Sequence, residues 1–86
     1  MFKIVKKKEL SPGVFHYDIE APRVAKKALP GQFIVLRVNE EGERIPLTIA
    51  DFDREAGTIT LIFQAVGAST ELLASLGEGD SIVDFV

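Results

Sequence analysis

Short runs of alternating apolar and polar residues, separated by turns that contain glycine or proline, constrain the fold of this chain most strongly. In residues 14–20, Phe15, Tyr17 and Ile19 fall on one side of an extended backbone and polar residues fall on the other. Four further segments are rich in strand-forming residues: residues 32–38, 45–52, 58–66 and 81–86. With the strand-like segment at the N-terminus, they predict six strands.

Turn signals show where two of these strands begin. Residues 53–57 predict a hairpin loop in which Gly57 supplies a positive φ. Pro46 lacks a backbone N–H, so its position near the start of a strand predicts a sheet edge or an opening in the ladder.

One segment breaks the β pattern. Residues 69–76 contain strong helix formers and end at Gly77, which predicts one short helix with Ser69 or Thr70 as its N-cap. Antiparallel strands with turns at this spacing favour a closed barrel, because closure removes exposed sheet edges. The sequence therefore predicts an all-β antiparallel barrel with a short helix before the last strand.

Length and composition exclude several classes of protein. The 86 residues suffice for one domain, and the formal net charge of −3 argues against a nucleic-acid partner. The chain has no cysteine, so it cannot itself hold a disulfide, a cysteine-ligated zinc ion or an iron–sulfur cluster. Its apolar runs are too short to cross a bilayer, and no signal-peptide pattern precedes the first strand. We therefore expect a cytoplasmic protein with no membrane partner.

Conventional catalytic groups are scarce. His16 is the only histidine, and its place on the polar face of a strand predicts an exposed side chain. The run Lys6, Lys7 and Lys8 predicts a solvated strand face or a strand edge. Ser69, Ser75 and Ser81 have no base nearby in sequence, and neither a P-loop nor a dinucleotide fingerprint is present. We expect no catalytic residue and no metal site.

Two segments could instead bind a ligand. The run from Gly67 through Ser69 to Thr70 combines a glycine turn, two hydroxyls and a helix start, a combination suited to a phosphate; simple helix capping is the alternative explanation. Around Pro46, in residues 44–49, the backbone groups could face a ligand in place of a neighbouring strand. An ordinary edge-strand proline explains this segment equally well.

Four motifs in chain order resemble the flavin-binding domain of the ferredoxin–NADP reductase family. They are Pro30-Gly31-Gln32-Phe33, Ile45-Pro46-Leu47-Thr48-Ile49, the run of residues 66–73, and Gly79-Asp80. The resemblance covers essentially the whole chain. It is strongest to the small subunits of NADH-dependent ferredoxin–NADP oxidoreductase and to the electron-transfer subunit of dihydroorotate dehydrogenase. It implies a six-stranded Greek-key barrel that binds FAD.

The resemblance also implies which residues contact the cofactor. The isoalloxazine ring would lie along Pro46, Leu47 and Thr48, with Leu47 where many relatives have a stacking tyrosine and Thr48 hydrogen-bonding near N5. The flavin or its ribityl chain would contact Ile62, Phe63 and Gln64, largely through their backbone. The pyrophosphate would lie at the helix start, against Gly67, Ser69 and Thr70, with Arg44 as a further phosphate candidate.

The sequence departs from the family pattern at identifiable places. Ile45 stands where many relatives carry a phosphate-binding arginine, and Arg44 lies one residue earlier. After residues 84–86 the chain has neither the nicotinamide-binding domain nor the cysteine-rich iron–sulfur segment of its relatives. We therefore expect an FAD-binding module of an electron-transfer oxidoreductase, catalytically incomplete alone, whose parent protein supplies both parts. The alternative is an excised or engineered barrel scaffold without effective flavin binding, which pairs with a second copy.

Overall fold

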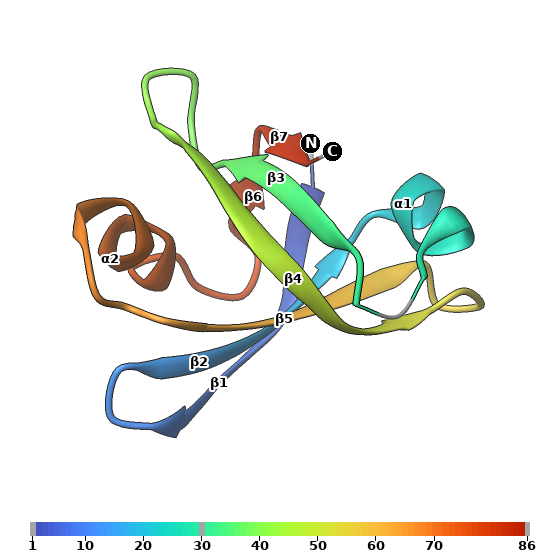
Figure 1. The fold of residues 1–86 in the computed structure, drawn as a ribbon, viewed down its shortest axis with the longest axis horizontal. Coiled ribbons are helices and arrows are strands. Elements are labelled where there is room, and N and C mark those ends of the chain that lie inside the picture. The colour runs from blue at the N-terminus through green and yellow to red at the C-terminus, as the bar shows by residue number, and fades with distance from the viewer. Residues whose placement is uncertain (1, 30, 86) are drawn as a thin grey trace.

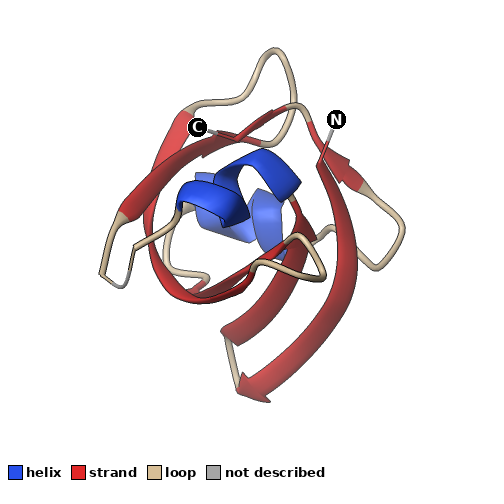
Figure 2. Cartoon of the chain, turned by 90° about the vertical axis from the view of Figure 1, so that its right-hand side faces the viewer, coloured by secondary structure: helices blue, strands red, loops and turns tan. Residues whose placement is uncertain are grey.

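The computed structural model describes residues 2–29 and 31–85 and shows a near-closed antiparallel barrel with a short helix at each end (Figures 1 and 2). Its elements are β1 (Phe2–Ser11), β2 (Val14–Glu20), α1 (Pro22–Lys27), β3 (Phe33–Arg37), β4 (Arg44–Asp53), β5 (Thr58–Gln64), α2 (Ala68–Ala74), β6 (Ser81–Ile82) and β7 (Asp84–Phe85). Met1, Pro30 and Val86, which belong to expected strands or motifs, lie outside the described residues. The all-β barrel class is confirmed.

The strands form one sheet in the order β6-β1-β2-β5-β4-β3-β7, and every pairing is antiparallel. β3, β4 and β5 are successive neighbours, and β2 lies beside β5, which is the neighbour order of a Greek key. Because β6 and β7 are adjacent in the chain but lie at opposite ends of this order, residues 81–85 bring the two edges together and nearly close the barrel.

The prediction of six strands was wrong, because the last predicted strand divides at Val83. β6 pairs with β1 through Ile82, whereas β7 pairs with β3 through Phe85. Between them, the Val83 N–H donates to the Arg37 carbonyl at 3.2 Å. Residues 81–82 pair with β1 and residues 84–85 pair with β3, at the two opposite edges of the sheet. The segment therefore forms two short strands and not one continuous strand.

The helices also differ from the prediction of one helix over residues 69–76. α2 begins earlier, after Gly67 as N-cap, and not after Ser69 or Thr70. α1 was not expected at all. It begins with Pro22, whose fixed φ suits the first helical turn, and it buries Ala25 against the end of the barrel.

The barrel interior is filled by the apolar face of each strand. Tyr17, Ile19, Ile59 and Leu61 are fully buried, which confirms the alternation predicted for residues 14–20 and the strand predicted over residues 58–66. The hairpin prediction is also confirmed, since Gly57 closes the β4–β5 turn at φ +73°.

Candidate functional site

Strand β4 changes its partner halfway along its length. Residues 44–48 pair with β3, whereas residues 49–53 pair with β5 after an irregularity next to Ile49. Residues 62–64 of β5 pair only with β2 on their other side. We call these two facing, mutually unpaired edges, residues 44–48 and 62–64, the β4–β5 fork (Figure 1). The opening in the ladder that Pro46 predicted is confirmed.

The fork presents four predicted site residues outwards and two inwards. Pro46, Thr48, Ile62 and Gln64 are exposed. Leu47 is half-buried and packs against the core, and its backbone pairs with Ile34 of β3. A pleated strand points alternate side chains to opposite faces, which explains the division along β4.

Phe63 points into the barrel. It is 5% exposed and its ring lies 5.8 Å from that of Phe15 and 5.1 Å from that of Tyr17, centroid to centroid. Phe63 is therefore held in the core by its side chain, and its backbone pairs with Phe15 of β2 on the side away from the fork.

Helix α2 begins at the open end of the fork, and its first residues are already hydrogen-bonded. The Thr70 hydroxyl accepts from the N–H groups of Val66 at 3.0 Å and Gly67 at 3.1 Å, and it donates to the Gly67 carbonyl. Thr70 thus shapes the turn that enters the helix. The Ser69 hydroxyl donates to Glu43 Oε2 at 2.9 Å, a contact that joins α2 to the start of β4. Ser69 is the hydroxyl donor of this turn that a ligand could recruit, by displacing the Glu43 carboxylate.

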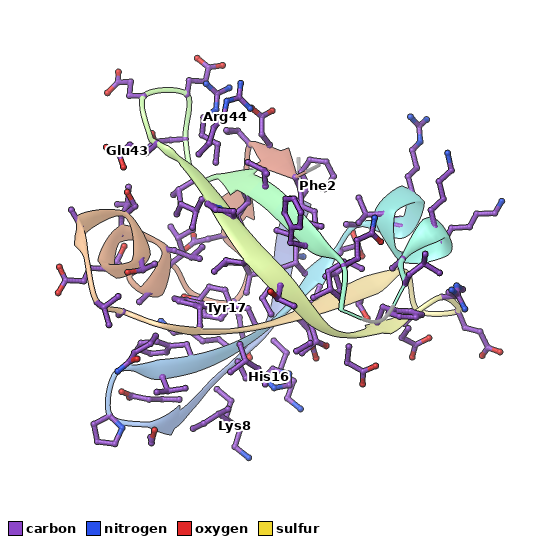
Figure 3. All side chains as sticks on the ribbon, in the orientation of Figure 1. Phe2, Lys8, His16, Tyr17, Glu43 and Arg44 are labelled. Atoms are coloured by element: carbon purple, nitrogen blue, oxygen red, sulfur yellow. The ribbon has the colours of Figure 1, made fainter. Side chains whose placement is uncertain are left out.

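Arg44 is not gathered with the helix start. It lies opposite Arg37 in the β3–β4 ladder, and its side chain extends on the side of the β3–β4 loop away from α2 (Figure 3). The structure therefore brings together Ser69, Thr70 and Gly67 at one end of the fork, with Pro46 and Thr48 along it, and leaves Arg44 outside this group.

Two residues that the site prediction missed hold α2 against the barrel. The Tyr17 hydroxyl lies 2.7 Å from the Leu73 carbonyl and 2.9 Å from the Leu76 carbonyl, and shares its proton between them. Lys7 Nζ donates to the carbonyls of Ala74 and Leu76 at 2.7 and 2.8 Å. The expectation of a solvated Lys7 was therefore wrong, whereas Lys6 and Lys8 are exposed. A single tyrosine on an apolar strand face was the available sequence signal.

Burial gives Tyr17 a measurable property. Burial first, and the Asp80 carboxylate second, raise the pKa of Tyr17 to about 12. Both disfavour the tyrosinate, because removing a proton would leave a charge inside the barrel and next to another negative charge.

The stability of the fold is expected to fall at alkaline pH. The unfolded tyrosine has an ordinary pKa of 10.0 and the folded one a pKa of about 12, so the unfolded state loses its proton first. The contribution is complete below pH 10 and declines between pH 10 and 12, by about 1.4 kcal/mol per unit. Urea titrations across this range test it, with Tyr17→Phe as the control, since Tyr17 is the only tyrosine. An equal decline in both proteins would contradict the assignment.

A polar hollow of about 570 Å³ lies on the outer face of β2, β4 and β5. Its lining comprises Lys6, His16, Asp18, Asp51, Phe52, Asp53, Arg54, Glu55, Thr58 and Thr60. His16 is half-buried there, with Nε2 at 3.0 Å from Asp18 Oδ1, so the prediction of a merely exposed histidine was wrong. Thr60 donates to the same oxygen at 2.6 Å.

Two further properties of the described residues bear on the kind of site. They contain no group of three or more His, Cys, Asp or Glu side chains that could hold a metal ion. No helix within the described ranges is long and apolar enough to cross a membrane.

Proteins of similar sequence place this arrangement in a family. The chain is 62% identical over 86 residues to the "uncharacterized protein in adh 3′ region" of Clostridium beijerinckii. It is 46% identical over 84 residues to a dihydroorotate dehydrogenase B (NAD(+)) electron transfer subunit homologue of Thermotoga maritima, and 33% identical over 76 residues to that subunit of Desulforamulus reducens. The chain is a homologue of dihydroorotate dehydrogenase electron-transfer subunits. No protein-family model matches it.

Solved structures agree with this homology. A chain of NADH-dependent reduced ferredoxin-NADP oxidoreductase, solved in a study of flavin-based electron bifurcation, superposes with a TM-score of 0.97 at 45% identity. The superposition includes 100% of the present chain and 31% of the oxidoreductase chain. A siderophore-interacting protein of Acinetobacter baumannii has the same fold, with a TM-score of 0.74 at 21% identity over 99% of this chain and 39% of that one. The predicted resemblance to the ferredoxin–NADP reductase family is confirmed.

The present chain corresponds to only part of these relatives. It spans 29% of the Clostridium beijerinckii protein and 30% of the Thermotoga maritima protein. It likewise spans 29% of the Desulforamulus reducens electron transfer subunit.

Proposed function

We propose that this chain is the FAD-binding barrel module of a cytoplasmic electron-transfer flavoprotein. The observation that carries the proposal is the β4–β5 fork, which leaves two strand edges unpaired beside the start of α2. Unpaired backbone N–H and C=O groups need partners. The polar edge of a flavin ring carries several acceptors and one donor, so the two edges and the ring satisfy each other.

The residues of the fork fit the chemistry of FAD. Thr48 has an exposed hydroxyl next to Pro46, whose missing N–H leaves room for a ligand in the ladder. The exposed amide of Gln64 suits the hydroxyls of a ribityl chain. When bound, FAD would supply the electron-transfer chemistry, and the barrel would supply binding, orientation and shielding on one side.

The pyrophosphate would lie at the turn from Gly67 to Ser69. Helical N–H groups in a first turn have no intrahelical acceptor, and the Ser69 hydroxyl adds a donor. The Glu43 carboxylate opposes phosphate binding here, because it is negatively charged and accepts the hydrogen bond of the Ser69 hydroxyl at 2.9 Å. Binding therefore requires Glu43 to release Ser69, a movement of one exposed side chain. Arg44 remains a further candidate only if its side chain swings across the loop.

The module is incomplete as a catalyst in this proposal. Its sequence has no glycine-rich dinucleotide fingerprint, so a nicotinamide-binding domain and an iron–sulfur partner would have to come from the parent protein. The competing proposal, a scaffold that binds no flavin and pairs with a second copy, draws on exposed apolar side chains such as Val66 and Leu29. Flavin titration separates the two.

Thr70→Ala is expected to weaken FAD binding by about tenfold, which corresponds to the loss of roughly one good capping interaction. The hydroxyl holds the N–H groups of Val66 and Gly67, so its loss loosens the turn that would receive the pyrophosphate. The measurement is FAD titration followed by flavin fluorescence and absorbance. Ser75→Ala is the matched control, because it removes an exposed hydroxyl from the other end of the same helix. Equal affinities in both variants would contradict the role of the turn.

A further inference from the structure

Phe33, the first residue of β3, is an aromatic side chain that the barrel leaves in solvent. It is 64% exposed, although the chain has only seven aromatic residues, six phenylalanines and one tyrosine, with which to fill its core. In the β3–β4 ladder it lies directly opposite Thr48. The Cβ atoms of such a pair lie about 5 Å apart and on the same face of the sheet. Phe33 therefore stands beside the hydroxyl that the proposed flavin site uses.

Phe33 also lines a shallow apolar groove of about 250 Å³ between β3 and α1. Val24 of α1 and Phe85 of β7 form further parts of its apolar wall, and Arg23 and Lys27 border it with positive charge. A planar apolar ligand with an electron-rich edge would cover the phenyl ring and face these cations. Phe33 thus belongs both to this groove and to the ladder pair with Thr48 of β4.

Leu47 cannot provide that aromatic surface. It is half-buried and packs against the core, so its side chain leaves the outer face of β4 to Pro46 and Thr48. The only phenylalanine of the described residues that is exposed as a large apolar side chain is Phe33.

We infer that Phe33 is the aromatic platform against which the isoalloxazine ring packs, with the ring extending from Thr48 towards the groove beside α1. The inference rests on the proposed flavin-binding function and names a positioning residue for it. Offset stacking of two aromatic systems contributes beyond the area they bury, which favours one ring orientation over others. Arg23 and Lys27 would then lie near the ring edge that enters the groove.

Riboflavin tests the ring contact separately from the phosphate contact. Phe33→Leu is expected to weaken riboflavin and FAD by the same factor, about three- to tenfold. Thr70→Ala should weaken FAD alone, because riboflavin has no phosphate. Both affinities are measured by fluorescence anisotropy of the flavin. Because Phe33 is exposed, its replacement by leucine leaves the buried core intact.

A tryptophan variant supplies a spectroscopic readout that a structural effect would not produce. The chain has no tryptophan, and indole in contact with an excited flavin quenches it by electron transfer. Phe33→Trp should retain binding and strongly quench bound riboflavin. Val5→Trp, at an exposed position of β1, should leave the emission of bound riboflavin unchanged.

The outcomes separate this inference from the function on which it rests. Binding by the parent chain with weaker binding by Phe33→Leu, and quenching only in Phe33→Trp, would support the platform. Equal binding by the parent and Phe33→Leu, or equal emission from the two tryptophan variants, would overturn the platform and leave the flavin function standing. Absence of riboflavin and FAD binding by the parent would overturn both.

Discussion

Tyr17→Ala is expected to lower the free energy of unfolding by about 3–5 kcal/mol, the range for truncating a large buried aromatic side chain. Tyr17 is completely buried and its ring contacts those of Phe15 and Phe63. Its hydroxyl also reaches the carbonyls at the end of α2. The substitution therefore empties part of the core and releases the helix whose start borders the fork.

Tyr17→Phe separates these two contributions. It keeps the ring and removes only the hydroxyl, so we expect a loss of about 1–2 kcal/mol. Chemical denaturation followed by circular dichroism measures both variants. Because Lys7 still donates to Ala74 and Leu76, helix α2 should stay docked in the phenylalanine variant. Equal stabilities of the alanine and phenylalanine variants would show that the buried ring does not hold the core as described.

Gly57→Ala is expected to destabilise the barrel by about 2–4 kcal/mol, which adds a left-handed backbone penalty to an overpacked contact. Gly57 has φ +73°, and an added Cβ would lie 3.2 Å from Pro22 Cβ and 3.3 Å from Pro22 Cα. The Gly57 carbonyl also accepts from the Ala21 N–H at 2.9 Å, so the turn cannot move away from α1 without losing that bond.

Gly13→Ala is the matched control for this prediction. Gly13 has φ +79°, but nothing lies within 4 Å of an added Cβ. It should therefore show the backbone penalty alone, about 1–2 kcal/mol. Thermal and urea unfolding of the two variants gives the difference. If both variants lost the same stability, the close approach of the turn to Pro22 would be of no consequence.

The strand pattern could be predicted from sequence because it depends on local alternation. Residues 14–20 and 58–63 each place their apolar residues on one face, and the structure buries those faces. The split of the last strand could not be predicted, because its two halves are decided by β1 and β3, which are distant in sequence. Helix α1 is likewise only six residues long, and its stability comes from packing more than from propensity.

The candidate site was predictable in position and less so in the state of its side chains. Pro46 predicted an opening in the ladder because it lacks an N–H, and it lies on the part of β4 that is unpaired with β5. That Thr70 is consumed by capping, and that Ser69 bonds Glu43 across 26 residues, depends on tertiary geometry. The same is true of Tyr17, whose helix partners follow it by more than 50 residues.

The location of the flavin is the central claim, and nuclear magnetic resonance of the chain titrated with FAD tests it most directly. We expect the largest shifts at the backbone amides of residues 44–48 and 62–64, except Pro46, and of residues 67–70 at the start of α2. Amides of Asp53, Arg54 and Glu55, which line the polar hollow at the β4–β5 turn away from the fork, should remain in place. Shifts centred on that hollow, or no shifts at saturating FAD, would contradict the account.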